Sequence, residues 1–147
     1  MNKYIVITSD IHGDYSTFNL VKLKEYYESY YWDLGDSEMT DEELWPFLSV
    51  KGNCDRFPFP LHEIIKVDDE VFYLSHHPLS EKEMLKLHEK EGVTVFLHGH
   101  LHAREERKLD GFLVLSPGSL SFPRDGQAGY LKLTVDKTLK NIDFIDI

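Results

Sequence analysis

The chain is organised by a series of short apolar runs, each followed within a few residues by a polar group that contains histidine, aspartate or asparagine. Apolar runs of this length, bounded by Gly, Asp or Ser, are typical of buried β-strands. Segments with helical spacing of apolar residues lie between the early runs. The sequence therefore predicts an α/β fold with a polar group at the carboxyl end of each strand. The runs are residues 4–7, 31–34, 49–51, 71–74 and 93–97.

The first helix is expected to begin near Ser16, between the first two apolar runs. Leu20, Leu23, Tyr27 and Tyr30 recur there at helical spacing and form its predicted apolar stripe. Two later helices are marked by capping boxes, in which a hydroxyl residue is followed three positions later by a glutamate. The two boxes are Thr40 with Glu43 and Ser80 with Glu83, and Gly92 is the predicted end of the later helix.

The second half of the chain is richer in strands. Residues 63–67 and 71–74 predict a β-hairpin, and Asp110-Gly111 between two β runs predicts a tight hairpin turn. Residues 130–135 and 141–147 predict the last two strands. Alternating strands and helices followed by a strand-rich half indicate two packed sheets flanked by helices.

The composition limits the class of partner. The chain has 147 residues, a formal net charge of −10 and one cysteine, Cys54. An acidic surface argues against a nucleic-acid polymer as partner, because such binding needs clustered positive charge. A single cysteine excludes an internal disulfide, and neither a signal peptide nor an apolar segment of membrane-spanning length is recognisable. We therefore expect a cytoplasmic protein without a membrane partner.

The polar groups that follow the strands carry the chemistry. Asp-x-His and His-x-His place both side chains on one side of an extended backbone, because strand side chains repeat every second residue. In open α/β sheets the carboxyl ends of the strands form one crevice, so these groups are expected to converge there. The seven candidates are Asp10, His12, Asp36, Asn53, His76, His100 and His102.

This set of side chains is suited to divalent cations. Imidazole and carboxylate ligands favour Mn, Fe, Zn or similar ions, and the absence of thiolate ligands argues against a closed structural zinc site. Seven ligands exceed the needs of one catalytic ion but suit two ions that share a bridging carboxylate. Two ions roughly 3.5–4 Å apart hold a bridging hydroxide and clamp the attacking and leaving oxygens of a phosphoryl transfer. The sequence therefore predicts hydrolysis of a phosphate ester.

The order of these motifs resembles the calcineurin-like metallophosphoesterase superfamily, and within it the small bacterial and archaeal phosphodiesterases of the YfcE type. The family order is Asp-x-His-Gly, Gly-Asp, Gly-Asn-x-Asp, a strand-end histidine and Gly-His-x-His, and it is reproduced between Tyr4 and Val135. Residues 116–119, which read Ser-Pro-Gly-Ser, and Pro123-Arg124 extend the resemblance. It implies one domain over residues 1–147, folded as a four-layer α/β/β/α sandwich of two mixed sheets flanked by helices.

The resemblance also implies roles for the candidate residues. It implies two divalent ions, manganese foremost and Fe, Zn, Ni or Mg as alternatives, and a small phosphorylated substrate; a homo-oligomer stays open. Asn53 is also expected to approach the phosphate. In the family pattern Asp10, His12 and His102 hold one ion, Asn53, His76 and His100 hold the other, and Asp36 bridges them.

Two positions depart from the family pattern. Where the family reads Thr-His-Gly-His, this chain reads Ser75-His76-His77-Pro78, so His76 and His77 are both candidate ligands; His76 is preferred for its spacing from the strand. Cys54 stands where monoesterase relatives carry a histidine that protonates the leaving alcohol. A thiol, with a pKa of about 8.5, is a weaker acid than an imidazole, with a pKa of about 6.5. Cys54 is therefore either a weak catalytic candidate or a packing residue.

Several other polar residues are expected to be structural. His62 on a strand and His88 on a helix are expected at the surface, and His98 is expected to support the site without binding an ion. Arg124 is a candidate either for contact with the phosphate or for pairing with an acidic side chain, and the second is preferred. Residues 116–119 are expected to form a tight turn beneath the site.

Other functional classes remain as alternatives. The retromer subunit resembles this family and serves as a non-catalytic scaffold, but a scaffold does not need the full ligand set. A phosphomonoesterase and a nuclease are further alternatives; Cys54 weighs against the first and the net acidic charge against the second. We therefore expect an enzyme, a dinuclear metal-dependent phosphodiesterase.

Overall fold

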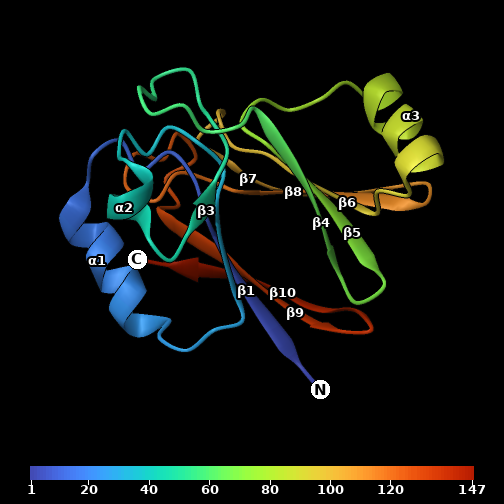
Figure 1. Cartoon of the computed structure of the whole chain (residues 1–147), viewed down its shortest axis with the longest axis horizontal. Coiled ribbons are helices and arrows are strands. Elements are labelled where there is room, and N and C mark those ends of the chain that lie inside the picture. The colour runs from blue at the N-terminus through green and yellow to red at the C-terminus, as the bar shows by residue number, and fades with distance from the viewer.

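Two five-stranded mixed sheets pack face to face in the computed structural model, which describes all residues from Met1 to Ile147 (Figure 1). The first sheet has the order β10 (Thr138–Asp146), β9 (Gly129–Asp136), β1 (Lys3–Thr8), β2 (Tyr30–Asp33) and β3 (Leu48–Ser49). The second has the order β4 (His62–Val67), β5 (Glu70–Ser75), β6 (Val95–Leu97), β8 (Phe112–Pro117) and β7 (Arg104–Leu109).

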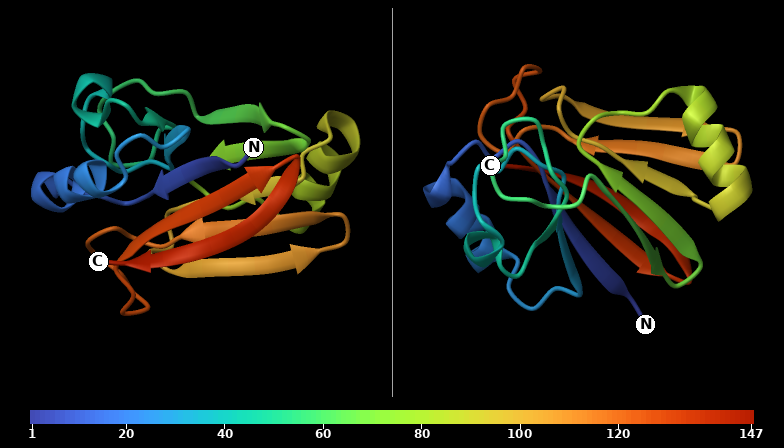
Figure 2. Two further views of the ribbon diagram at one scale, coloured as in Figure 1. Left: turned by 90° about the horizontal axis from the view of Figure 1, so that it is seen from below. Right: turned by 45° about the horizontal axis from the view of Figure 1, so that its top comes forward.

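Helices cover the outer face of each sheet, as the two further views in Figure 2 show. The first sheet carries α1 (Tyr15–Lys24) and the single-turn α2 (Asp41–Leu44), and the second carries α3 (Glu81–Glu91). This arrangement confirms the expected four-layer α/β/β/α sandwich. None of the three helices is long and apolar enough to cross a membrane.

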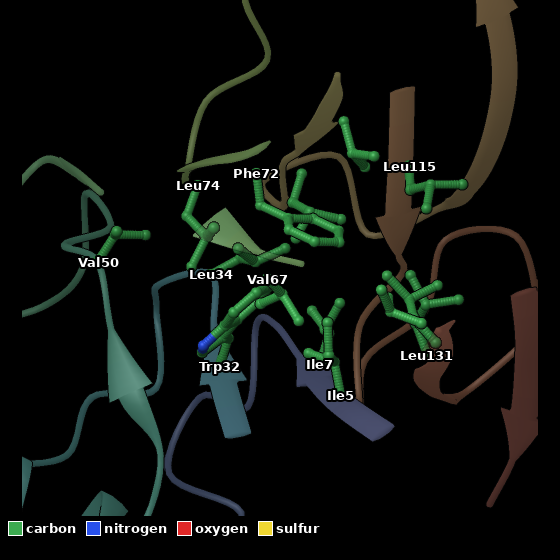
Figure 3. Packing of buried hydrophobic residues seen from close by; sticks show 14 residues of the cluster. Ile5, Ile7, Trp32, Leu34, Val50, Val67, Phe72, Leu74, Leu115 and Leu131 are labelled. Atoms are coloured by element: carbon green, nitrogen blue, oxygen red, sulfur yellow. The ribbon is translucent and has the colours of Figure 1, made fainter. Parts of the chain in front are cut away.

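The largest hydrophobic cluster lies between the two sheets and contains 14 buried residues (Figure 3). Side chains alternate across each sheet, so Ile5 and Ile7 of β1 enter this cluster while Val6 packs toward α1. In the same way Leu97 of β6 faces the other sheet and Phe96 packs against α3. Each such side chain stabilises the fold by about 1.5–3 kcal/mol when buried, so the contact between the sheets fixes their relative position.

Parallel pairing brings the strand ends to one edge. β1 pairs with β2 and β2 with β3 in parallel, and β6 pairs in parallel with both β5 and β8. Backbone hydrogen bonds then join neighbouring loops beyond the strands, from Asp10 to Gly35 at 3.0 Å and from Gly99 to His76 at 2.9 Å. The loops after five strands therefore meet at one end of the sandwich.

Local sequence signals were accurate for the later helices and turns. Both capping boxes form, with Thr40 and Ser80 as the N-caps, and Gly92 ends α3 in the left-handed conformation at φ +72°. The Asp110-Gly111 turn joins β7 to β8 as expected. The third strand lies one or two residues earlier than expected, at Leu48–Ser49.

The predicted apolar stripe of the first helix was wrong. Phe18 and Val21 are the buried residues of α1, whereas Leu20, Leu23 and Tyr27 are 61%, 75% and 86% exposed. The helix ends at Lys24, and Tyr30 already belongs to β2. Both faces of α1 carry apolar residues, so periodicity did not identify the face that packs on the sheet.

Candidate metal centre

Loops at five strand ends bring all seven predicted ligands together. Each lies within 4.0 Å of at least one other member through a side-chain nitrogen or oxygen. The loop after β1 supplies Asp10 and His12, that after β2 supplies Asp36, that after β3 supplies Asn53, that after β5 supplies His76, and that after β6 supplies His100 and His102. The structure tests where these side chains lie, and their role as ligands remains a prediction.

One half of the cluster is formed by Asp10, His12 and His102. Nε2 of His102 lies 3.3 Å from Oδ1 of Asp10, and Nε2 of His12 lies 3.9 Å from the same oxygen. The two imidazole Nε2 atoms are 3.4 Å apart. These three ligand atoms are close enough to share one ion.

The other half is formed by Asn53, His76 and His100. Nε2 of His76 lies 3.1 Å from Oδ1 of Asn53 and 3.3 Å from Nδ1 of His100. His76 is buried, whereas His77 is exposed with its ring centroid 4.3 Å from that of His100. Of the two adjacent histidines, His76 is therefore the one that points into the cluster.

Asp36 lies between the two halves. Its Oδ2 is 3.2 Å from Nε2 of His76 and 4.0 Å from Nε2 of His12. Its Oδ1 accepts a 2.7 Å hydrogen bond from the backbone N–H of Cys54. Burial alone raises the pKa of Asp36, but the hydrogen bonds from His76 and Cys54 outweigh burial and lower the pKa to about 2.

The pKa values of two histidines in the second half, His76 and His100, are also shifted. Burial lowers the pKa of His76, but its hydrogen bonds with Asp36 and the Leu34 carbonyl raise the pKa above its ordinary value. Burial and the neighbouring rings of His77 and His76 lower the pKa of His100. The environment of His76 therefore favours the protonated, positively charged imidazole.

The backbone of the site is held in an unusual conformation. Five of the seven candidates have positive φ angles between 47° and 72°, a region that non-glycine residues occupy at a cost of about 1–3 kcal/mol each. Backbone strain of this kind collects at functional sites, where the surrounding fold enforces it. The five are Asp10, His12, Asp36, His100 and His102.

Two glycines allow the loops to approach each other. A Cβ atom at Gly52 would overlap the carboxylate of Asp36, and one at Gly99 would overlap the hydroxyl of Ser9 and lie 3.0 Å from Oδ2 of Asp10. Both positions therefore require glycine if the two carboxylates are to keep their places.

Three histidines are oriented by acceptors at Nδ1. Nδ1 of His12 donates to Glu38 at 2.9 Å, Nδ1 of His76 to the Leu34 carbonyl at 2.7 Å, and Nδ1 of His102 to the Phe122 carbonyl at 2.8 Å. Each contact leaves Nε2 directed into the cluster, where the neutral imidazole presents a lone pair, the arrangement found for histidines that bind metals. No sequence motif indicated the role of Glu38.

Asp55 fixes the loops that carry the cluster. Its carboxylate accepts hydrogen bonds from the backbone N–H groups of Asp36, Glu38 and Gly52 at 2.8–2.9 Å. Its place in the Gly-Asn-x-Asp motif was a signal for this role. Ser119, in the turn expected beneath the site, donates a 2.7 Å hydrogen bond to the backbone carbonyl of Asp10.

The donor set fits divalent cations. Oδ1 of Asp10 is buried and has no hydrogen-bond partner, although an unpaired buried carboxylate oxygen is costly. Two Nε2 lone pairs, those of His12 and His102, face each other at 3.4 Å and repel unless a positive charge lies between them. A cation beside Asp10 resolves both features. We conclude that the residues present suit metal binding.

The remaining predicted residues lie around this centre. Cys54 is exposed beside it, with Sγ near the ligand atoms of His12 and Asp36. Partial burial and the carboxylates of Asp36 and Glu38 raise the pKa of the Cys54 thiol. His98 is buried and contacts Glu105 at 2.7 Å, outside the cluster, as expected.

Three other expectations concerned the surface. His62 is exposed as expected, whereas His88 is half-buried and bonds through Nδ1 to the Val93 carbonyl. Arg124 forms no ion pair, so the expectation that it pairs with an acid was wrong; its backbone N–H instead donates to the carbonyl of His102.

Comparison with known proteins agrees with this geometry. The model of the calcineurin-like phosphoesterase superfamily domain matches residues 4–138. The chain is 32% identical over 115 residues to a probable metallophosphoesterase of Methanocaldococcus jannaschii, a match that covers 74% of this chain and 60% of that protein. It is 28% identical over 152 aligned positions to the probable metallophosphoesterase YsnB of Bacillus subtilis. That match covers 97% of this chain and 90% of YsnB. The chain thus spans less than two thirds of the first relative.

Solved structures extend the comparison. A conserved predicted phosphoesterase from Streptococcus pneumoniae superposes with a TM-score of 0.86 at 26% identity, covering 99% of this chain and 90% of that chain. The phosphoesterase YfcE from E. coli has a TM-score of 0.66 at 18% identity, and the match covers 97% of this chain and 100% of that chain. Vacuolar Protein Sorting 29 from Cryptosporidium parvum has a TM-score of 0.71 at 14% identity, covering 99% of each. The last two likenesses show the fold alone.

Proposed function

Since this chain belongs to the calcineurin-like phosphoesterase superfamily, whose members are metal-dependent phosphoesterases, we propose that it is a phosphodiesterase that uses two divalent metal ions. The observation that carries this proposal is the position of Asp36. Its carboxylate lies between two groups of ligand-type side chains, at 3.2 Å from His76 and 4.0 Å from His12.

We assign three side chains to each ion and share the seventh. One ion takes Asp10, His12 and His102, whose ligand atoms lie together, and the other takes Asn53, His76 and His100. Asp36 bridges them. Manganese is the ion that we expect to support most activity, because imidazole and oxygen donors without a thiolate suit it.

The protein's contribution to the chemistry is orientation and charge. When bound, two such ions supply a nucleophilic hydroxide at neutral pH and stabilise charge on the phosphoryl oxygens. Glu38 and the Leu34 and Phe122 carbonyls keep the histidine Nε2 atoms directed at the centre. Nδ2 of Asn53, exposed at the rim, lies 3.6 Å from Sγ of Cys54 and has a second N–H that can donate to a phosphate oxygen.

A diester is the preferred substrate class. Beside Asp36 and His12 the side chain is that of Cys54, so a strong general acid for an alkoxide leaving group is absent at that position; the imidazole of His77 lies beside the other half of the cluster, next to His100. A diester also carries one negative charge fewer than a monoester dianion to a centre that contains the carboxylates of Asp10 and Asp36.

Metal removal and reloading test the proposal. Protein stripped with a chelator and reloaded with Mn²⁺ is expected to hold two ions per chain by elemental analysis and to hydrolyse bis(4-nitrophenyl) phosphate faster than 4-nitrophenyl phosphate. One ion per chain at saturation would contradict the dinuclear site. A faster monoester reaction would contradict the substrate class.

A scaffold role is the second candidate, because Vacuolar Protein Sorting 29 shares this fold. The complete ligand set favours the enzyme, since a scaffold does not need five strained backbone positions at one point. Failure of every reloaded form, with Mn, Fe, Zn, Ni or Mg, to hydrolyse either ester would favour the scaffold.

A further inference from the structure

A cavity of about 540 Å³ begins where the metal centre ends. Cys54 and Glu38 line it on the side of the cluster, where Sγ of Cys54 lies near Asp36 and the Glu38 carboxylate holds His12. Arg56 and Phe57 also line it. Cavities of this size hold small organic ligands. A group attached to phosphorus at the centre therefore has space to enter.

Three charged residues line this cavity, Glu38, Glu43 and Arg56, and only the arginine has no side-chain partner. Glu38 is paired with His12, and Glu43 accepts hydrogen bonds from the Thr40 N–H at 2.9 Å and from the Tyr15 hydroxyl at 2.7 Å. The hydrogen bonds from Thr40 and Tyr15 lower the pKa of Glu43, so its carboxylate stays charged and hydrogen-bonded. Arg56, by contrast, forms no ion pair and no side-chain hydrogen bond.

The position of Arg56 is fixed from both sides along the chain. It follows Asp55, whose carboxylate accepts three backbone N–H groups. It precedes Phe57, which packs against the outer cluster of the first sheet with its ring centroid 4.7 Å from that of Phe59. The exposed guanidinium is therefore carried by an anchored segment, and its donors are free to bind an anion.

The apolar part of the cavity has a flat wall. Phe57 is half-buried against the outer cluster of the first sheet, which includes the buried Met39. Together with Pro58 they offer a surface on which an aromatic or other flat group packs. The cavity thus combines an apolar face with one free cation.

We propose that this cavity, defined by Cys54, Arg56 and Phe57, binds one ester group of the phosphodiester and selects a flat apolar group with an anionic substituent. The substituent, a carboxylate or a second phosphate, pairs with Arg56, while the ring packs on Phe57. This inference rests on the proposed phosphodiesterase activity. In a chain with a net charge of −10, an unpaired cation that lines this cavity favours an anionic substituent over a neutral one.

Three 4-nitrophenyl diesters test the inference, with methyl, phenyl or 3-carboxyphenyl as the second ester group. All three release 4-nitrophenol, so the reporter is constant. In the Mn²⁺-loaded protein, kcat/KM is expected to rise from methyl to phenyl, and by a further factor of about three to ten from phenyl to 3-carboxyphenyl. A 3-phosphonophenyl ester shows whether a phosphate-like anion is preferred to a carboxylate.

Arg56→Gln is expected to reduce the 3-carboxyphenyl to phenyl ratio to about one. Lys140→Gln is the matched control, because it removes one exposed positive charge next to Leu139, which pairs with Val135 at the opposite end of the sheet from the centre. It is expected to leave the ratio unchanged. Equal kcat/KM for phenyl and 3-carboxyphenyl esters in the wild type would overturn the inference and leave the proposed function intact.

A binding measurement separates failure of the inference from failure of the activity. If no diester is hydrolysed, the proposed function fails, but the Arg56 Nε–H resonance still reports on the cavity. A shift of that signal with 3-carboxyphenyl phosphate, and none with phenyl phosphate, supports the binding site. Equal effects of both compounds, or no effect, overturn it.

Discussion

The carboxylate of Glu38 accepts a 2.9 Å hydrogen bond from Nδ1 of His12, and this contact directs Nε2 of the imidazole toward the metal centre. A carboxylate behind a metal-binding histidine orients the ring and increases its basicity. We expect Glu38→Ala to weaken Mn²⁺ binding by about tenfold or more, and Glu38→Gln, which keeps an acceptor, to weaken it less. Competition with a chelator measures both. Glu106→Gln, at an exposed strand position, is the control. Unchanged affinity in Glu38→Ala would contradict this role.

Asp36→Asn is expected to cause the greatest loss of activity of any single ligand change. The amide has no charge to share between two ions, so both are held less tightly. After dialysis against a chelator and reloading, we expect less than 1% of wild-type turnover and fewer than two ions per chain. Asp143→Asn, an exposed site on β10, is the control. Near-normal turnover in Asp36→Asn would show that the two-metal interpretation is wrong.

Histidine substitutions separate the ligands from the other histidines. His76→Ala and His102→Ala are each expected to reduce metal content, whereas His62→Ala and His88→Ala are not, because those side chains lie outside the cluster. Elemental analysis after reloading measures the difference. His77→Ala is the closest control, since a greater loss at His77 than at His76 would move the ligand by one position. Equal losses from all variants would indicate general destabilisation.

Cys54→His is expected to improve hydrolysis of alkyl phosphomonoesters relative to aryl diesters. The thiol lies beside Asp36 and His12, so an imidazole at this position is close enough to protonate a leaving alcohol. General-acid catalysis contributes roughly 10²–10⁴-fold, although a newly introduced histidine is expected to give only part of that gain. The measurement is kcat/KM for both ester types in both proteins. An unchanged ratio would leave Cys54 as a packing residue.

The buried carboxyl of Asp33 gives a prediction about stability and pH. It accepts hydrogen bonds from the Thr8 hydroxyl, the Ser49 hydroxyl and the Gly35 N–H at 2.8–3.1 Å, and burial raises its pKa to about 7. The folded protein therefore keeps a proton that the unfolded chain loses above about pH 4. This group contributes stability at low pH that is lost as pH rises toward 7.

Asp33→Asn is expected to remove this dependence of stability on pH. The free energy of unfolding of the variant, relative to wild type, is expected to rise by on the order of 2 kcal/mol between pH 4.5 and 7.5, measured with urea on metal-free protein. Asp143→Asn provides a control with an exposed carboxylate. Parallel pH curves for Asp33→Asn and wild type would show that Asp33 is ionised in the folded state.

Much of the architecture could be predicted because its signals are local. A capping box such as Ser80 with Glu83 satisfies backbone N–H groups within one helical turn, and the Asp110-Gly111 turn needs only its own backbone conformation. The strand-end placement of Asp10 and Asp36 followed in the same way, because an apolar run fixes where a strand ends.

The sequence by itself thus determined which polar groups stand at strand ends and, through the order of the motifs, the family. Only the tertiary structure decided which face of α1 is buried, since Phe18 and Leu20 are both apolar and the sheet selects between them. It also decided that Glu38 meets His12 and that Arg56 stays unpaired beside the centre. These contacts join loops far apart in the chain, and no short-range periodicity encodes a distance that the packing of two sheets sets.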